Sequence, residues 1–404
     1  MEQKYVLDYK DNNTEELTGI EKVDKIFNRY RPKLEQVEGD GRWHTENALE
    51  HTINVLEEMK ALIKKYDGLE EYKNLLISAA LLHDIGKKEP KNDKEHPVRS
   101  WEYVKDEIPQ IFDENQKETL EYLIKDHMTF FHPNGPLTSY KPTYEEQILM
   151  LALHLADIKG SQYNKKFEGL ATQYNKNVER VLEKYLNHKY KIEIKEKNKE
   201  KEFSLDRLIN ELENGKNENK GKYVIIPIGI SASGKSYTYE QLKRELETKG
   251  LSIESISYDK IREQIYEKKY GEPPKNYNEM YKKFLQDRSL EKDLKREFIN
   301  SLESAIRDES INIVYIDNLN HTLKSREKII NWTKEFGRKY NKDIHVIYLY
   351  YTPNLWKSLK NNSKAKKLHP RVIMQQLAQF DKPTENENYE RLYVIDGDLE
   401  NQTK

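Results

Sequence analysis

Apolar residues recur at helical spacing along the first half of the chain. In the segment TENALEHTINVLEEMKALIKKY, residues 45–66, they follow one another at three- and four-residue steps: Leu49, Ile53, Leu56, Met59 and Ile63. This spacing places side chains on one face of a helix. Three further stretches have the same character: KNLLISAALLHDI at 73–85, KETLEYLIKDHM at 117–128 and YEEQILMLALHLADI at 144–158. The pattern predicts an all-α helical bundle between residues 20 and 188.

Beyond Gly221 the pattern changes to short apolar runs separated by helical stretches. The runs are KYVIIPIGI at 222–230, LSIESISY at 251–258, INIVYID at 311–317 and IHVIYLYY at 344–351. Alternating strands and helices are typical of a parallel sheet with right-handed crossovers. The sequence therefore predicts two domains, an N-terminal all-α bundle and a C-terminal α/β domain with a parallel sheet.

Two charged stretches with few apolar residues separate these patterns. They are KYKIEIKEKNKEKEF at 189–203 and ENGKNENKGK at 213–222, and such composition is typical of linkers or surface segments. We place the domain boundary near residues 190–221. The intervening FSLDRLINEL, 203–212, is expected to form a short helix that packs on either neighbour.

The amino-acid composition limits which partners and metal ligands the protein can have. The 69 Lys and Arg residues nearly balance 70 Asp and Glu, which excludes a globally basic protein but not a local basic groove. The chain has no cysteine, so any metal must be bound by nitrogen and oxygen. The N-terminus lacks the pattern of a secretory signal, and no apolar run approaches the roughly 20 residues of a membrane span. We therefore expect a cytoplasmic protein with no membrane partner.

The run AALLHDIGK, residues 79–87, ends an apolar helix on the pair His83 and Asp84. His51 lies on the preceding helical segment, and Asp157 lies on a later one. Metal sites in bundles are commonly built from facing helices, and two imidazoles with two carboxylates suit Mn, Fe, Ni, Co or Zn. Water bound to such an ion becomes a nucleophile near neutral pH. Lys87, one turn further on, could hold an anionic substrate oxygen.

This arrangement resembles the HD phosphohydrolase superfamily between residues 35 and 160, because HDIGK is close to the usual spelling of that family's motif. The resemblance implies that the metal ligands are His51, His83, Asp84 and Asp157, and that the reaction is hydrolysis of a phosphoester. Members with two metal ions place further ligands where this chain has His96 and His127, but Met128 stands where a second histidine is common. His44 is a candidate to bind phosphate or to support the ligands. An ordinary structural role is the alternative for these last three histidines.

The segment GISASGKS, residues 229–236, fits the phosphate-loop pattern G-x-x-x-x-G-K-[ST] between a strand-like run and a helical one. Backbone N–H groups of such a loop and the following helix N-terminus bind phosphates. Lys235 would reach the β- and γ-phosphates, and Ser236 would hold Mg²⁺. The predicted nucleotide contacts are Gly229, Ser231, Ala232, Ser233, Gly234, Lys235, Ser236 and Tyr237.

Side chains that could handle the phosphate acceptor follow the next strands. Asp259 ends the second strand and can take a proton from an attacking hydroxyl, while Arg262 can clamp an anionic group. The third strand ends in Asp317, a predicted contact of the nucleotide or of Mg²⁺, and the residues after it are predicted to bind the acceptor: Asn318, Asn320 and Arg326. A basic stretch at the position of a kinase lid carries Lys357, Lys360, Lys364, Lys366, Lys367 and Arg371. Arg371 is the predicted nucleotide contact there, and a solvated charged loop is the alternative.

Together these features resemble the 5′-hydroxyl polynucleotide kinases between residues 222 and 385. Ser257, Asp259 and Arg262 match the family's S-x-D-x-x-R element, which implies that Asp259 is the general base and that Arg262 holds the phosphate beside the reactive hydroxyl. The family lid normally offers arginines, whereas this one is mostly lysine before Arg371, and lysine binds phosphate as a point charge.

The order of the parts resembles the bifunctional HD-Pnk end-healing enzymes: an HD domain at 1–190, a charged linker at 191–221 and a kinase domain at 222–404. This resemblance implies ATP or another NTP, Mg²⁺ and a transition metal (Mn, Ni, Co, Fe or Zn) as cofactors. It also implies nucleic-acid ends as partners, RNA before DNA, and a separate ligase.

Two other functions stay open. One is a small-molecule kinase, for a nucleoside or a sugar, fused to an HD nucleotidase. The other is a signalling phosphohydrolase regulated by nucleotide. No oligomeric state is predicted.

Overall fold

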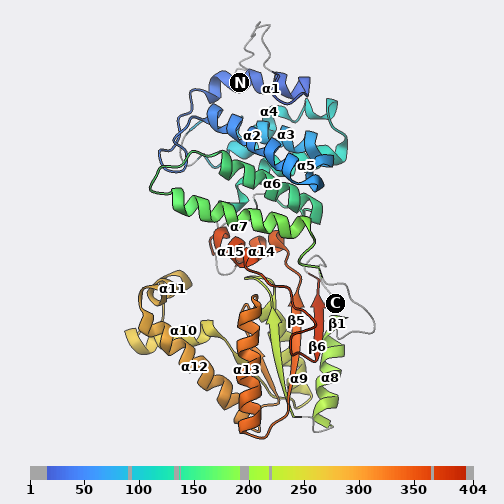
Figure 1. Cartoon of the computed structure of the whole chain (residues 1–404), viewed down its shortest axis with the longest axis vertical. Helices are drawn as coiled ribbons and strands as arrows, with labels where there is room; N and C mark the ends of the chain where they lie inside the picture. Colours follow the sequence, from blue (N-terminus) through green and yellow to red (C-terminus); the bar gives the residue numbers. More distant parts are fainter. Residues whose placement is uncertain are drawn as a thin grey trace. The chain divides into compact units, whose positions relative to one another are not determined.

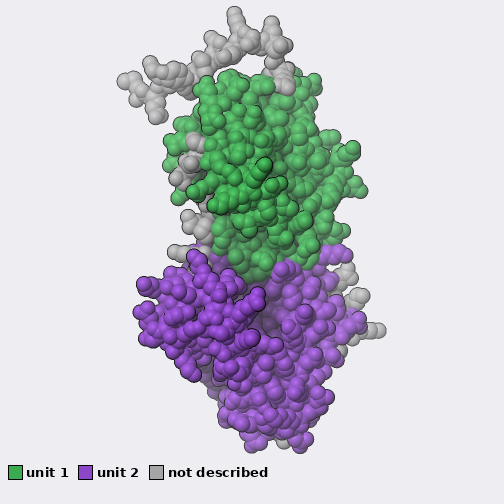
Figure 2. Space-filling model, turned by 60° about the vertical axis from the view of Figure 1, so that its left-hand side comes forward, with its two compact units in different colours: residues 1–187, 369–378 green, residues 188–368, 379–404 purple. Residues whose placement is uncertain are grey.

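The computed structural model describes residues 16–89, 93–131, 136, 138–191, 200–217, 221–364 and 368–396 (Figure 1). It divides into two compact units (Figure 2), of which the first comprises residues 1–187 and 369–378 and the second residues 188–368 and 379–404. The chain thus returns to the first unit for ten residues near its C-terminal end. The first unit is helical and the second is α/β, which confirms the predicted fold class.

All the regular secondary structure in the described part of the first unit is helical. The α-helices are α1 (Glu21–Leu34), α2 (Ala48–Lys65), α3 (Lys73–Leu82), α4 (His96–Val104), α5 (Glu114–Asp126), α6 (Tyr144–Gly160), α7 (Glu168–Leu186) and α15 (Pro370–Ala378). Three short 3₁₀ helices join them: η1 (Asp67–Tyr72), η2 (Ile108–Gln110) and η3 (His127–Phe130).

Helices α2 and α6 form the centre of this unit. Helix α6 is buried over most of its circumference, as expected of a helix that is apolar all round. A capping box fixes its start, because the Thr143 hydroxyl accepts from the backbone N–H of Glu146 while the Glu146 carboxylate accepts from that of Thr143. Helix α2 buries the predicted face except that Ile53 is only half buried. Two fixed helices therefore carry His51 and Asp157.

Helix α15 completes the helical unit although it follows β5 and α14 in the sequence. It packs along α7 and buries Ile373, Met374 and Leu377. The Lys184 ammonium on α7 donates to the carbonyls of Leu377 and Ala378, at 3.4 and 3.0 Å, which are the last carbonyls of α15. A cation at a helix C-terminus satisfies these acceptors and suits the helix dipole.

The second unit contains a parallel sheet with helices. Its elements are β1 (Glu200–Glu202), α8 (Leu205–Asn217), β2 (Lys222–Ile228), α9 (Lys235–Thr248), β3 (Ile253–Ile256), α10 (Tyr258–Tyr270), α11 (Tyr277–Gln286), α12 (Arg288–Arg307), β4 (Ile313–Ile316), α13 (Leu323–Lys339), β5 (Ile344–Tyr351), α14 (Leu355–Lys364) and β6 (Arg391–Ile395).

The six described strands lie in the order β1-β6-β5-β2-β4-β3, and every neighbouring pair is parallel. Strand β2 is buried along its whole length, which explains its unbroken apolar sequence. Because the strands are parallel, the residues that follow β2, β3 and β4 all emerge at the carboxyl ends of the strands, on the same side of the sheet. This side carries the P-loop, Asp259 and Asp317.

The segment predicted as a charged linker contains two elements of the α/β unit. Strand β1 extends the sheet beside β6, and α8 places Leu208, Ile209 and Leu212 in its hydrophobic core. The short helix expected in 203–212 is therefore present and packs on the C-terminal neighbour. Residues 192–199 and 218–220, also within the predicted linker, lie outside the described residues.

Among the described helices, none is both long enough and apolar enough to cross a membrane.

Candidate active sites

The helical unit brings a group of predicted ligands together around Asp84, which follows the C-terminus of α3. His83 precedes it, and the others lie on different elements: His51 on α2, His96 at the start of α4, His127 at the start of η3 and Asp157 on α6. All six side chains are buried. Four titratable groups from four further elements thus converge on one His–Asp pair, as the sequence pattern predicted for the first four ligands.

The two oxygens of Asp84 face different histidines. Oδ2 lies 3.9 Å from His51 Nε2 and 3.7 Å from His83 Nε2, and it accepts from Lys87 Nζ at 3.2 Å. Oδ1 lies 3.0 Å from His96 Nε2 and 3.6 Å from His127 Nε2.

A second carboxylate lies beside His51, because Asp157 Oδ1 is 3.0 Å from His51 Nε2. Asp84 is therefore placed to bridge two groups of ligands, one with His51, His83 and Asp157 and one with His96 and His127.

Backbone carbonyls set the tautomer of three of these histidines. The Nδ1–H of His83 donates to Ala80 O at 2.9 Å, that of His127 donates to Ile124 O at 2.7 Å, and that of His96 donates to Asp93 O. A histidine that donates from Nδ1 presents an unprotonated Nε2 on the other side of the ring, which is the usual arrangement for a metal ligand.

The donor set fits divalent cations. Within the described part of the chain, His83 Nε2 is buried and has no hydrogen-bond partner, which is costly unless something binds it. The Nε2 atoms of His96 and His127 face each other at 3.0 Å, although their Nδ1 atoms hold the protons. Ions between these atoms would remove both conflicts. Imidazole and carboxylate ligands suit transition metals, in agreement with the expected cofactors.

Electrostatics in the site favour charged carboxylates and one charged imidazole. Burial acts against ionisation of Asp84, but Lys87 and the neighbouring imidazoles hold its pKa well below the usual value. Burial likewise disfavours the charged form of His51, yet hydrogen bonds to Asp157 and Glu46 raise its pKa to about 9. Burial lowers the pKa of His83 to about 4. Lys87 keeps a raised pKa through Asp84 despite burial, so it is available as a cation for a substrate oxygen.

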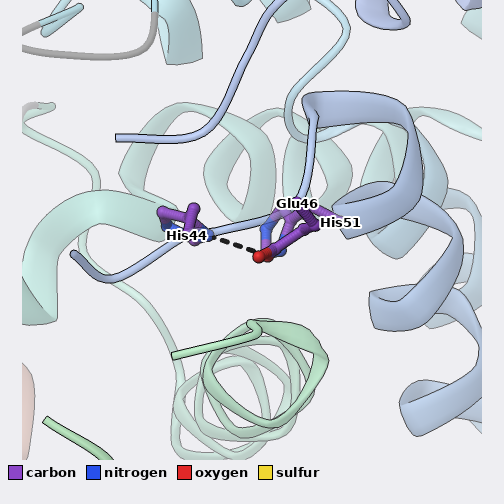
Figure 3. A group of neighbouring side chains, drawn as sticks. All are labelled: His44, Glu46 and His51. Carbon is purple, nitrogen blue, oxygen red and sulfur yellow. Dashed lines mark hydrogen bonds and ion pairs between the residues drawn. The ribbon is translucent and has the colours of Figure 1, made fainter. Parts of the chain in front are cut away.

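Glu46 is a site residue that the sequence patterns did not reveal. Its buried carboxylate lies between two histidines, with Oε1 at 3.1 Å from His44 Nδ1 and at 3.4 Å from His51 Nδ1 (Figure 3). Glu46 thus faces His51 Nδ1 at ion-pair distance, on the side where the other ligand histidines donate to backbone carbonyls. His44 reaches the site through this carboxylate, which agrees with its expected supporting role. The signal for Glu46 was its position in TEN, just before α2, where a capping residue is the ordinary interpretation.

In the α/β unit, the P-loop lies between β2 and α9 as predicted. Ala232 and Gly234 have positive φ values of 62° and 103°, which turn successive backbone N–H groups toward one side. The Lys235 ammonium donates to the carbonyls of Gly229 and Ile230, at 3.0 and 2.6 Å. The remaining predicted loop residues, Ser231 and Ser233, lie in the same turn, and Ser233 Oγ also accepts from Lys235, at 3.3 Å.

Ser236 and Asp317 form the predicted magnesium pair. The Ser236 hydroxyl donates to Asp317 Oδ2 at 3.2 Å, and the two residues come from α9 and from the end of β4. A hydroxyl and a carboxylate so placed are the ligands that P-loop proteins offer to Mg²⁺. Tyr237 is 60% exposed beside them and accepts from Gln241. Asn361 of α14, which was not predicted, donates to the Ala232 carbonyl at 3.2 Å and so ties the helix after β5 to the loop.

Asp259 and Arg262 lie together at the carboxyl end of β3. Ser257 caps α10 by accepting from the backbone N–H of Asp259, which places both side chains in the first turn of the helix. Arg262 NH1 donates to Asp259 Oδ1 at 2.7 Å, and the Tyr277 hydroxyl donates to the same oxygen at 3.2 Å. Tyr277 was not predicted. The arrangement provides a carboxylate for a proton and a guanidinium for an anion side by side.

Three residues predicted to bind the acceptor have contacts within the protein. Asn318 Oδ1 accepts from the backbone N–H of Tyr258 at 2.9 Å, and buried Asn320 donates to the carbonyl of Pro227 at 2.8 Å. Arg326 is fully buried and forms a two-bond ion pair with Glu387, at 2.7 and 2.8 Å. The expectation is therefore corrected for Asn320 and Arg326, because buried side chains paired in this way cannot reach an acceptor.

The predicted lid divides between the two units. Lys357, Lys360 and Lys364 lie on α14 in the α/β unit, whereas Lys366 and Lys367 lie outside the described residues. Arg371 belongs to the helical unit, where its guanidinium lies 4.6 Å from the ring centre of Trp43 and 5.0 Å from that of Tyr174. These contacts are cation–π interactions. The nucleotide contact of Arg371 stays a prediction.

The two sites define a protein with two chemical centres, a histidine–aspartate metal site in a helical bundle and a P-loop nucleotide site in an α/β unit. Comparison with known families agrees: residues 48–158 match the model of the HD domain, and residues 210–373 match that of 6-phosphofructo-2-kinase. The chain therefore joins an HD phosphohydrolase domain to a kinase-like domain. No curated protein matches the sequence.

Proposed function

We propose that the protein heals broken nucleic-acid ends, with RNA as the favoured substrate. The kinase-like domain transfers the γ-phosphate of ATP or another NTP to a 5′-hydroxyl, and the HD domain removes a 2′,3′-cyclic phosphate or a 3′-phosphate. The observation that carries this proposal is the Asp259–Arg262 pair at the carboxyl end of β3, held at 2.7 Å. One guanidinium beside one carboxylate suits a hydroxyl flanked by a single phosphodiester.

In the kinase reaction, the oxygen of the 5′-hydroxyl attacks the γ-phosphorus while the bond from that phosphorus to the bridging β–γ oxygen breaks. Asp259 takes the hydroxyl proton, and the nucleoside diphosphate leaves in the P-loop. Lys235 must exchange its two loop carbonyls for phosphate oxygens, which are stronger acceptors. Mg²⁺, when held by Ser236 and Asp317, neutralises the charge that develops on the phosphates.

In the HD domain, Asp84, Asp157 and the four buried histidines would hold one or two divalent ions. Such ions polarise a phosphoryl oxygen and lower the pKa of a coordinated water. The protein's own contribution is orientation: three histidines are fixed by backbone carbonyls and His51 by Glu46. Lys87, at 3.2 Å from Asp84, is placed to bind a substrate oxygen at the edge of this site.

The family match favours a second candidate function, because 6-phosphofructo-2-kinase phosphorylates a sugar phosphate. The acceptor of the kinase-like domain would then be a small phosphorylated sugar, and the HD domain would hydrolyse a small phosphoester. Both candidates use the same P-loop and the same Asp259. In the kinase-like domain they differ only in what Arg262 holds.

The test uses one short RNA with a 5′-hydroxyl and a 2′,3′-cyclic phosphate. It is incubated with the protein, ATP, Mg²⁺ and Mn²⁺ or Ni²⁺, and the mass of the product is measured by mass spectrometry. A gain of a 5′-phosphate with conversion of the cyclic end to a hydroxyl supports end healing. Lys235→Ala should then abolish only the first change, and Asp84→Asn only the second. RNA that returns unchanged while a hexose phosphate is phosphorylated under the same conditions would establish the second candidate instead.

A further inference from the structure

An exposed aromatic ring lies next to the proposed general base. Tyr281 on α11 keeps 40% of its surface exposed. The guanidinium carbon of Arg262 lies 5.3 Å from the centre of its ring, while Arg262 NH1 donates to Asp259. Since that carbon and NH1 are bonded about 1.3 Å apart, the ring centre and Asp259 Oδ1 are no more than about 10 Å apart.

A second contact fixes the ring relative to Asp259. Tyr277, one turn earlier on α11, lies with its ring nearly parallel to that of Tyr281, at 12° and 5.9 Å between centres. The hydroxyl of Tyr277 donates to Asp259 Oδ1 at 3.2 Å. Two contacts, one through Arg262 and one through Tyr277, therefore link the exposed ring to the carboxylate. Figure 1 shows α10, α11 and α12 grouped at one side of the α/β unit, and α12 contacts α10, α11 and β3.

The position of Asp259 determines which part of a substrate meets this ring. The 5′-hydroxyl must lie within hydrogen-bonding distance of Asp259 to lose its proton, and the phosphodiester on its other side lies at Arg262. The base of the same nucleotide then lies about one nucleoside length from Asp259. The Tyr281 ring centre, which lies no more than about 10 Å from Asp259 Oδ1, is within reach of that base.

Resting on the proposed kinase function, we propose that Tyr281 and Tyr277 form a stacking platform for the terminal base of a single-stranded 5′ end. Any base presents a flat face, so the platform accepts all four, which suits an enzyme that repairs ends of arbitrary sequence. A sugar phosphate has no planar group and would leave the ring unused. Lys282, exposed on α11 next to Tyr281 in the sequence, adds positive charge for the backbone of the strand.

Two oligonucleotides test the platform. Both are short single-stranded RNAs with a 5′-hydroxyl and identical sequence, but one carries an abasic residue at its 5′ end. Removal of a stacked base or of its aromatic partner should lower kcat/KM by about 5- to 100-fold, the loss that corresponds to stacking of a single base.

Three variants are compared with the wild type. Tyr281→Ala should lose activity on the complete RNA and show no further loss on the abasic one, because both changes remove the same contact. Tyr281→Phe keeps the ring and should behave as the wild type. Tyr270→Ala is the matched control, since Tyr270 is also 40% exposed and near two lysines but has no contact with Asp259 among the described interactions.

The outcomes separate this inference from the proposed function. If the wild type phosphorylates both RNAs equally well, or if Tyr281→Ala behaves as Tyr270→Ala does, the platform is refuted and the kinase function stands. If the wild type phosphorylates neither RNA, the proposed function itself fails and the platform fails with it. A base-dependent rate that Tyr281→Ala alone abolishes establishes the platform.

Discussion

The sequence predicts that Arg326 on α13 binds the acceptor, whereas its buried contacts indicate a structural role. Replacing Arg326 by methionine distinguishes the two roles. Its guanidinium forms two hydrogen bonds to Glu387 and two more through NH1, to the carbonyls of Asn320 and Asp381 at 3.1 and 3.0 Å. No part of the side chain is exposed. We expect Arg326→Met to destabilise the α/β unit and to leave phosphoryl transfer intact in the folded protein.

The size of the effect follows from what remains after the change. Glu387 would stay buried without its cation, and breaking a buried pair in this way costs about 3–5 kcal/mol. Two hydrogen bonds to the carboxylate survive, from the Tyr348 hydroxyl at 3.1 Å and from the backbone N–H of Thr384 at 3.0 Å. They place the cost in the lower part of this range. For a unit of about 200 residues the loss corresponds to a fall in Tm of about 6–20 °C.

Calorimetry of the full-length protein measures this loss. The transition of the α/β unit is the one that ATP and Mg²⁺ raise, because a ligand stabilises the unit that binds it. Arg326→Met should lower that transition alone. The double variant with Glu387→Met should regain most of the loss, since replacing both partners of a buried pair by apolar groups is often nearly neutral. Arg338→Ala, on the same helix and exposed, is the control and should change little.

The reasoning is refuted by a variant that melts like the wild type. If Arg326→Met also raised the KM for the acceptor, at a temperature well below the transition, Arg326 would bind the acceptor as its position in the sequence suggested. A lowered transition with an unchanged KM is the expected result.

Three further predictions concern the helical unit. Asp84→Asn should remove all bound metal, whereas His127→Gln should spare metal held by His51, His83 and Asp157, as counted by elemental analysis after dialysis; complete loss in both would argue against the bridging role of Asp84. Ile373→Ala should destabilise this unit by about 2–5 kcal/mol in calorimetry, whereas the 38% exposed Val372→Ala should not; equal melting would show that α15 is not part of it. A Cβ at Gly86 would lie 2.5 and 2.6 Å from backbone atoms of α4, so Gly86→Ala should lower both Tm and metal content.

Local patterns predicted the elements that carry chemistry. The apolar spacing before Lys65 gave helix α2, and the short β-branched runs after Gly221 gave the strands of the parallel sheet. The P-loop and the His–Asp pair were visible because their function depends on residues adjacent in the chain. Asp259 and Asp317 could be placed together because parallel strands end at a common edge of the sheet.

Contacts between distant segments could not be predicted in the same way. Arg326 pairs with Glu387, 61 residues further on, and nothing in either local sequence distinguishes this pair from exposed charges. Tyr277 lies 18 residues after Asp259, within a segment whose many tyrosines made any single one uninformative. For both pairs the missing information was which segments pack against each other. Glu46 is a local case, because nothing in its sequence shows that its carboxylate lies between His44 and His51.

Strand β1 and helix α8 show a related limit at the domain boundary. A three-residue strand of charged residues can join a sheet edge because its backbone supplies the hydrogen bonds. Its side chains give no sign of this pairing, and the charged composition therefore indicated a linker. Helix α8 has a buried apolar face, but its flanks are so polar that it could belong to either neighbour. Packing against the sheet determines which domain α8 belongs to, and the spacing of its apolar residues does not predict this packing.

The path of the chain also limits how the two activities can be separated. Helix α15 belongs to the helical unit, yet it follows β5 and α14 in the sequence, so a cut after residue 187 removes it. Such a fragment would expose the face of α7 that α15 covers and would lose the Lys184 contacts with its last carbonyls. Low phosphohydrolase activity in that fragment would then report a damaged fold rather than a dependence on the kinase-like domain. Point variants in the full chain avoid this confusion, because Lys235→Ala and Asp84→Asn each change one site and leave α15 in place.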